Sequence, residues 1–211
     1  MRVIAIDGPA GAGKSTVARA LAARLGLEYL DTGAMYRAVT YAAMRRGIDP
    51  ADAERVARLA EEISLEVDEH GVLVDGVDAT TEIRSREVTT AVSAVAANSA
   101  VRTELVRRQR NWANRRGGGV LEGRDIGSVV FPDAELKLYL TASPRVRAER
   151  RVAEAGGDVD EIETAIARRD GYDTTRSNSP LVEAEGAVVV DTTGLSIDEV
   201  LQRIEQLLER E

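Results

Sequence analysis

The sequence of 211 residues contains no cysteine and only one histidine, His70. Without cysteine the chain can form no disulfide, perform no thiol catalysis and build no cysteine-ligated zinc site. One histidine is also too few for a histidine-based metal site. We therefore interpret His70 as a turn residue and expect the chemistry of this chain to use neither thiol nor imidazole.

The chain also lacks an excess of basic residues and any long apolar run. Its 28 lysines and arginines are outnumbered by 36 aspartates and glutamates, so the net charge is −8. No global basic field attracts nucleic acid or an anionic membrane, and a bound anion must be held by a local cluster. No run has the length of a membrane span, and the chain opens on a predicted strand instead of a signal peptide. We expect a soluble cytoplasmic protein that binds neither nucleic acid nor membrane and, lacking a spare apolar stripe, is monomeric.

Lysine is rare, because every basic residue except Lys14 and Lys137 is an arginine. Lys14 belongs to a run that matches G-x-x-x-x-G-K-[ST], namely Gly8, Pro9, Ala10, Gly11, Ala12, Gly13, Lys14, Ser15 and Thr16. A β-branched stretch over 2–7 precedes this run and good helix formers over 17–25 follow it, which is the context that the pattern requires. Glycines let successive backbone N–H groups wrap an anion, and a helix N-terminus favours negative charge.

This loop is predicted to bind the phosphates of ATP through its nine residues. Lys14 would reach the β- and γ-phosphates, and Ser15 would offer its hydroxyl to Mg²⁺. The structural alternative is a glycine-rich turn that merely precedes a helix, which the flanking strand and helix disfavour.

The pattern along the chain predicts an α/β fold, a P-loop core with a five-stranded parallel sheet flanked by helices on both faces. Strands are expected over 2–7, 27–30, from 120, over 135–141 and over 187–191. Helices are expected over 17–25, 34–46, 51–63, from 81 through 95, over 101–116 and over 196–208. Thr32 is expected to cap the helix beginning at Ala34, and Ser196 with Glu199 forms a capping box. Alternating apolar residues over 64–80 predict a small antiparallel β insert with His70 at its turn.

Two arginines stand where an anion is expected. Arg37 lies near the first turn of the helix over 34–46, where a cation opposes the helix dipole, so we infer that an anion binds there. Arg124 and Asp125 follow a core strand at its carboxyl end, the place where open α/β sheets bind ligands. A solvated surface arginine and an ion pair that ties a loop together are the respective alternatives.

The segment between the last two strands is rich in arginine. Gly156 and Gly157 divide it into a predicted helical hairpin, which could close over a triphosphate and supply guanidinium groups to the transferring phosphoryl. A purely structural charged hairpin is the alternative. Together with Lys14, the arginines predicted to assist catalysis are Arg147, Arg150 and Arg176.

Other classes of P-loop protein fit less well. A GTP-dependent switch needs an Asn-Lys-x-Asp guanine reader, and neither lysine provides one. A motor or transport ATPase would place Asp-Glu at the end of a strand, where this chain has Leu140 and Thr141. A small-molecule kinase acting on AMP, UMP or shikimate stays open, although the arginine clusters favour a phosphorylated acceptor over a neutral alcohol.

The whole chain resembles the bacterial cytidylate kinases. The resemblance is carried by the loop over 8–16 and by further segments in the same order, over 31–37, 107–110, 123–127, 130–134 and 169–176. It implies transfer of the ATP γ-phosphoryl group to CMP or dCMP. It also implies three domains: a core over 1–31, 98–142 and 180–211, a nucleoside-monophosphate-binding domain over 32–97 with the small β insert, and an arginine-rich helical lid over 143–179.

The resemblance further assigns CMP-binding roles by position. It gives Arg37, Arg124 and Arg176 to the acceptor phosphate. It gives Ser93, Arg102 and Asp125 to the cytosine, and Arg169 and Asp173 to the sugar. Thr32, in the segment over 31–37, is expected among the CMP-binding residues. An aspartate at 125 can accept a hydrogen bond from the exocyclic amine of cytosine, which uracil lacks.

Overall fold

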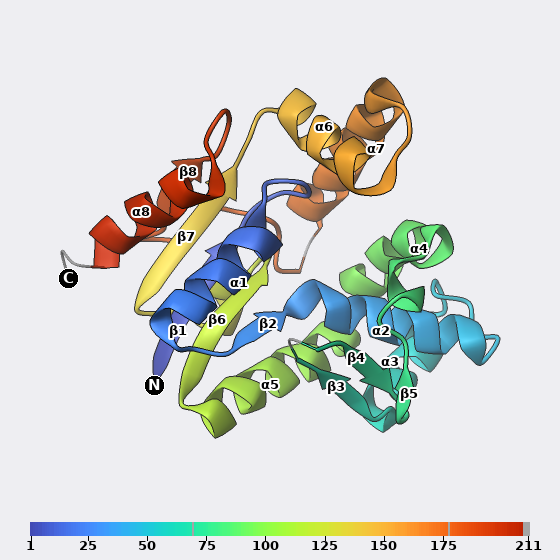
Figure 1. Ribbon diagram of the computed structural model, residues 1–211. Helices are drawn as coiled ribbons and strands as arrows, with labels where there is room; N and C mark the ends of the chain where they lie inside the picture. The colour runs from blue at the N-terminus through green and yellow to red at the C-terminus, as the bar shows by residue number, and fades with distance from the viewer. Residues whose placement is uncertain (69, 177, 209–211) are drawn as a thin grey trace. The chain divides into compact units, whose positions relative to one another are not determined.

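The computed structural model describes residues 1–68, 70–176 and 178–208 and divides into two compact units (Figure 1). Unit 1 comprises Met1–Tyr29 and Gly117–Glu211, and unit 2 comprises Leu30–Arg116. The phosphate-binding loop and the arginine-rich hairpin belong to unit 1. The predicted β insert belongs to unit 2.

The sheet of the α/β fold has five strands in the order β2-β6-β1-β7-β8. The strands are β1 (Arg2–Asp7), β2 (Tyr29–Asp31), β6 (Gly118–Gly123), β7 (Leu136–Thr141) and β8 (Val188–Asp191). β1 pairs in parallel with β6 and with β7, and β7 pairs in parallel with β8. Every residue of β1 after Arg2 is buried, as expected for a central strand covered on both faces. The predicted α/β class and five-stranded sheet are confirmed.

The helices of unit 1 are α1 (Lys14–Leu25), α6 (Pro144–Ala155), α7 (Val159–Thr175) and α8 (Ile197–Leu208). α1 packs on β6 and on α8, and its Val17 and Leu21 are buried in one core with Leu138 and Leu201. Segments α6 and α7 pack on each other as the predicted helical hairpin. The capping box at the start of α8 is also confirmed, with Ser196 and Glu199 bonded to each other.

The predicted start of the third core strand was wrong, because β6 begins at Gly118 and not at Val120. Gly118 has φ +136° and pairs with Arg2 of β1. A Cβ at Gly118 would lie 1.9 Å from the carbonyl oxygen of Arg2, so this register needs glycine. Glycine thus belongs to the strand here instead of only ending the preceding helix. Strand β2 was also displaced, occupying Tyr29–Asp31 instead of 27–30.

The described part of unit 2 contains four helices, a 3₁₀ turn and a small antiparallel sheet. The elements are α2 (Thr32–Arg45), α3 (Ala53–Glu62), β3 (Leu65–Val67), β4 (Val72–Val74), β5 (Val77–Asp78), η1 (Glu82–Arg84), α4 (Arg86–Ala97) and α5 (Ser99–Arg116). The three strands pair antiparallel in the order β3-β4-β5, which confirms the predicted insert. His70 lies in the turn between β3 and β4, where the Asp68 carboxylate accepts its backbone N–H (2.8 Å).

The predicted cap of α2 was wrong. Thr32 is the first residue of the helix, and Asp31 is the capping residue, with its carboxylate accepting the backbone N–H of Ala34 (2.9 Å). Asp31 has the extended backbone of a capping residue, and aspartate caps at least as well as threonine. Thr32 is buried, and its role in ligand binding stays a prediction.

Candidate active site

The loop over 8–16 has the backbone of a phosphate-binding loop. Gly11 and Gly13 have φ of +78° and +87°, in the left-handed region that favours glycine. Gly8 has φ +145°, and a Cβ there would lie 2.0 Å from the carbonyl oxygen of Leu140 on the neighbouring strand. Gly13 is the N-cap of α1 and brings no side chain to it, so the first backbone N–H groups of the helix can receive an anion.

Lys14 is the first residue of α1 and is only 7% exposed. Its ammonium donates a hydrogen bond to the carbonyl oxygen of Pro9 (2.8 Å). Burial lowers the pKa of Lys14 to about 7, and repulsion from Arg124 and Arg169 acts in the same direction, against attraction from Glu122 and Asp7. A bound polyanion would raise this lowered pKa again and favour the charged ammonium, so the position of Lys14 suits an anionic ligand.

Three arginines surround one carboxylate in unit 1. The Nε of Arg124 donates to Asp173 (2.8 Å), and Arg176 forms a longer ion pair with the same residue (3.7 Å). Burial would raise the pKa of Asp173, but Arg124, Arg169 and Arg176 outweigh it and hold that pKa below its ordinary value. The carboxylate of Asp170 also attracts Arg169, and three guanidinium groups against these two carboxylates leave a local excess of positive charge.

Arg169 is unfavourably placed for a cation. Burial, reinforced by repulsion from Arg124, lowers the pKa of Arg169 to about 10. Its Nε is buried and has no hydrogen-bond acceptor among the residues that the structure describes. An unpaired buried donor is unfavourable unless a ligand accepts from it. The structure therefore brings the predicted residues Arg124, Arg169, Asp173 and Arg176 together in one positively charged cluster close to Lys14.

Asp125 follows Arg124 at the end of β6 and is 5% exposed. It precedes a π-helical turn, η2 (Ile126–Val130), that the sequence pattern did not predict. The carboxylate of Asp7, the last residue of β1, accepts the backbone N–H groups of Ile126 and Gly127, both at 2.8 Å. The strand that leads into the phosphate-binding loop is thus bonded directly to the loop that carries Asp125.

The guanidinium groups of Arg147 and Arg150 donate hydrogen bonds to other residues of the protein. Arg147 is buried and donates to the carbonyl oxygen of Ala10 (2.9 Å) and to the carboxylate of Asp170 (2.6 Å). Arg150 donates to the hydroxyl and carbonyl oxygens of Thr192 (2.9 and 2.8 Å). The structure places both predicted catalytic arginines beside the phosphate-binding loop, with their guanidinium groups engaged by other residues.

The remaining predicted residues lie in unit 2. Arg37, on α2, is 8% exposed and donates to the hydroxyl of Thr89 (2.8 Å) and the carbonyl oxygen of Ile83 (3.2 Å). It is therefore not a solvated surface arginine. Arg102, on α5, is 4% exposed, with its guanidinium 5.3 Å from the ring centre of Tyr36 on α2. Ser93 lies half-buried on α4, which packs on α2.

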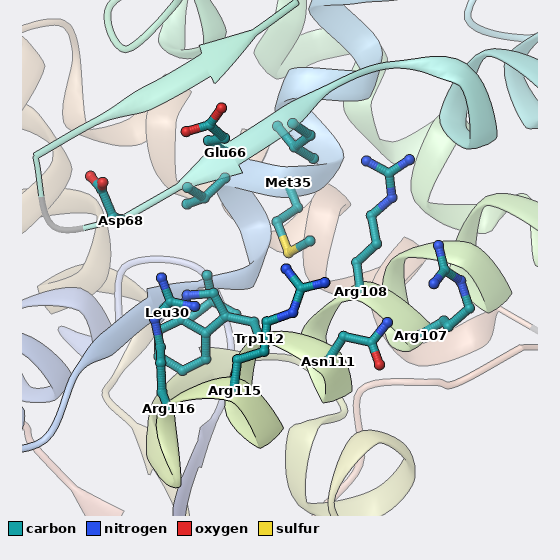
Figure 2. Close-up of a pocket in the computed structure, with 12 residues that line it drawn as sticks. Leu30, Met35, Glu66, Asp68, Arg107, Arg108, Asn111, Trp112, Arg115 and Arg116 are labelled. Atoms are coloured by element: carbon teal, nitrogen blue, oxygen red, sulfur yellow. The ribbon is translucent and has the colours of Figure 1, made fainter. Parts of the chain in front are cut away.

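A cavity of about 560 Å³ in unit 2 lies between the β insert and the C-terminal half of α5 (Figure 2). Its lining includes Glu66, Arg108 and Trp112 but none of the residues predicted to bind ATP or CMP. Arg108 donates to Glu104 and to the carbonyl oxygens of Ala60, Glu61 and Ile63 at the end of α3. In the arginine run over 107–110, Arg108 thus joins α3 to α5.

The chemistry of the loop is compatible with a magnesium nucleotide. Within the described residues, no group of three or more histidine, aspartate or glutamate side chains could hold a metal by itself. Mg²⁺ in phosphoryl-transfer enzymes takes one or two protein oxygens and completes its shell with phosphates and water. Ser15 is exposed in the first turn of α1 and can provide one such oxygen.

Among the described helices, none is long and apolar enough to cross a bilayer.

Three residues near the loop were not predicted to take part. Asp7 directly precedes the loop, and the carboxylate of Asp170 accepts the backbone N–H of Ala10 (3.4 Å). Glu122, on β6, is 4% exposed, accepts a hydrogen bond from the hydroxyl of Tyr29 and attracts the ammonium of Lys14. The signal available in the sequence was position, since Asp7 directly precedes the loop and Glu122 stands at the carboxyl end of a buried strand.

Comparison with known proteins gives one consistent family. The family model described as cytidylate kinase matches residues 4–210. A cytidylate kinase from Corynebacterium efficiens is 51% identical over 216 residues, covering 98% of this chain and 94% of that protein. A cytidylate kinase from Mycobacterium leprae is 48% identical over 213 residues, covering 99% and 96%. A solved structure of shikimate kinase from Acinetobacter baumannii in complex with shikimate has a TM-score of 0.52 at 17% identity, covering 100% and 94%, and shares the fold.

Proposed function

Because this chain belongs to the cytidylate kinase family, we propose that it transfers the γ-phosphoryl group of ATP to CMP or dCMP, giving CDP or dCDP and ADP. The observation that carries this proposal is the buried excess of positive charge formed by Arg124, Arg169 and Arg176 around Asp173, close to Lys14. A phosphate-binding loop alone would serve many nucleotide-dependent proteins. A second cationic cluster beside it suits an acceptor that is itself a phosphate dianion.

We assign the donor nucleotide to the loop over 8–16. The glycine backbone and the N-terminus of α1 would wrap the phosphates, and the ammonium of Lys14 would move from the Pro9 carbonyl to the β- and γ-phosphates. The Ser15 hydroxyl would hold Mg²⁺, which neutralises charge on the phosphates as the γ-phosphoryl group transfers. The exposed position of Ser15 and the positive φ of Gly11 and Gly13 support this assignment.

We assign the acceptor nucleotide to the residues that the sequence predicted to bind CMP. Arg37, Arg124 and Arg176 are proposed to bind the CMP phosphate, Ser93, Arg102 and Asp125 the cytosine, and Arg169 and Asp173 the sugar. Thr32 is proposed to contribute from the start of α2. Support comes from the burial of Arg37, Arg102 and Asp125, since buried charged groups usually serve a specific partner.

The reaction needs positioning and charge neutralisation more than proton transfer. The acceptor phosphate is already ionised near neutral pH, so no general base is required to activate its oxygen. Arg147 and Arg150 would stabilise charge on the transferring group after exchanging their bonds to Asp170 and Thr192 for bonds to phosphate oxygens. We propose that the hairpin α6–α7, within 143–179, acts as the lid that makes this exchange and excludes water.

The test is to measure ADP release from Mg-ATP with CMP, dCMP, UMP, AMP and shikimate offered separately, and with no acceptor as background. We expect strong turnover with CMP and dCMP and weak turnover with the other three. Equal turnover with UMP would keep the kinase but remove the discriminating role of Asp125. Activity confined to AMP or shikimate would overturn the proposal.

A further inference from the structure

Asp7 joins the two loops that the proposed reaction depends on. It is the last residue of β1 and directly precedes Gly8, the first residue of the phosphate-binding loop. Its two carboxylate oxygens accept the backbone N–H groups of Ile126 and Gly127 separately, each at 2.8 Å. These two residues open η2, immediately after Asp125. One buried side chain therefore spans from the ATP loop to the segment assigned to cytosine.

The carboxylate is kept in this position against an unfavourable environment. Asp7 is 4% exposed. Burial raises its pKa to about 6, and the Asp125 carboxylate adds to the rise, while the bonds from Gly127 and Ile126 and the charge of Lys14 oppose it. A neutral side chain could fill the space without placing a second carboxylate near Asp125. Aspartate has two oxygens, so it can accept from both N–H groups. A neutral side chain of this size, such as asparagine, has only one oxygen and would turn its NH₂ group toward the other donor.

The two bonds fix the direction in which Asp125 emerges. Asp125 has φ −147° and ψ 26°, and its side chain makes no capping bond to η2. The backbone after it is pinned at two consecutive amides by Asp7, and the backbone before it is the end of β6, where Gly123 pairs with Asp7. The placement of the Asp125 carboxylate is therefore set by Asp7 on one side and by the sheet on the other.

We propose that Asp7 is a positioning residue for acceptor recognition, which holds Asp125 at the place where it distinguishes cytosine from uracil. The inference rests on the proposed function, since it requires that Asp125 face the base. Asp7 itself contacts no substrate in this arrangement and acts through the backbone of Ile126 and Gly127. Its charge also attracts Lys14, but less strongly than Glu122 does, so its loss should lower the selectivity for CMP more than it affects ATP.

The test is the variant Asp7→Asn, measured for kcat/KM with CMP and with UMP and for KM of ATP. Asparagine keeps the shape but has one oxygen, so its amide group opposes one of the two N–H donors. Losing one charge-assisted bond and burying an unpaired donor should reduce the CMP-to-UMP ratio of kcat/KM by roughly tenfold to a hundredfold. The KM for ATP should change by no more than about twofold if Asp7 acts through Asp125.

A matched control is Asp52→Asn. Asp52 caps α3 and also accepts a backbone N–H, from Arg55 (3.1 Å), but belongs to no proposed binding set. It should leave the CMP-to-UMP ratio unchanged. Circular dichroism and thermal unfolding of each variant would establish that the protein is folded during the assay.

The double variant Asp7→Asn, Asp125→Ala separates positioning from a direct role. If Asp7 acts through Asp125, adding Asp7→Asn to Asp125→Ala should not reduce the ratio further. A further loss in the double variant, an unchanged ratio in Asp7→Asn, or a raised KM for ATP with the ratio intact would each overturn the inference. A wild-type protein that does not phosphorylate CMP would instead overturn the proposed function, so the two failures are distinguishable.

Discussion

Replacing Lys14 by methionine should stabilise the ligand-free protein while removing most of its phosphoryl transfer. Methionine keeps an unbranched side chain of similar length and removes the charge. Lys14 is 7% exposed, and its ammonium lies near the positive charges of Arg124 and Arg169. The substitution removes a buried cation whose cost the Pro9 carbonyl and the charges of Glu122 and Asp7 offset only in part.

The size of the effect follows from the environment of the ammonium. Burial and the neighbouring arginines lower the pKa of Lys14 from 10.5 to about 7, which corresponds to roughly 5 kcal/mol against the charged form. Relaxation around a buried charge and the loss of its attraction to Glu122 and Asp7 reduce what its removal recovers, so we expect a gain of about 1–4 kcal/mol, the upper range for apolar replacement of a buried ion pair. In a chain of this size each kcal/mol raises the Tm by about 2–4 °C.

The pH dependence of the stability difference between Lys14→Met and wild type tests the reasoning more sharply than its size at one pH. The folded-state pKa of Lys14 lies below its unfolded value, so the stability linked to this group is fully present above pH 10.5 and is lost as the pH falls through about 7. The advantage of Lys14→Met over wild type should therefore be largest and constant below about pH 7. It should shrink steadily between pH 7 and 10.5.

Urea unfolding of the nucleotide-free protein at several pH values from 6 to 9.5, with ADP release measured in parallel, checks both halves of this prediction. The control is Lys137→Met, because Lys137 is the only other lysine, is partly exposed and donates to the carbonyl oxygen of Glu185 (2.7 Å). A Lys14→Met protein that is less stable than wild type at pH 6 would refute the reasoning. So would a stability difference that stays the same from pH 6 to 9.5, or turnover at the wild-type level.

Two further predictions concern selectivity and strand pairing. Asp125→Ala should selectively reduce the preference for CMP over UMP, and an unchanged ratio of kcat/KM for the two nucleotides would contradict its assignment to the base. Gly118→Ala should destabilise the protein by about 2–4 kcal/mol in urea unfolding, because its Cβ would meet the Arg2 carbonyl oxygen at 1.9 Å within a central strand pair. Its matched control, Gly117→Ala, has φ +74° but open space around the added Cβ, so it should lose only about 1 kcal/mol. Equal losses in the two glycine variants would show that the close approach to Arg2 is not what matters.

Features that depend on neighbouring residues in the chain were predictable. The loop over 8–16, the capping box at Ser196 and the antiparallel insert over 64–80 arise from spacings of two to four residues or from a glycine pattern, and all are present as expected. Where two such signals stand on adjacent residues, the sequence did not decide between them. Asp31 and Thr32 are both of residue types that cap helices, and only the backbone conformation showed that Asp31 is the cap.

By itself, the sequence thus determined the α/β class, the phosphate-binding loop, the family and the residue types that such a kinase needs. The tertiary structure alone decided how these residues are paired. Asp7 accepts hydrogen bonds from Ile126 and Gly127, which lie 119 and 120 positions further along the chain. Arg147 and the Ala10 carbonyl that it bonds are 137 positions apart, and Arg124 and Asp173 are 49 positions apart. Such pairings depend on which strands become neighbours and on the register between them, and no local period or composition specifies either. The sequence therefore determines which chemical groups are available. Their pKa values and the orientation of their side chains depend on the tertiary structure that brings them together.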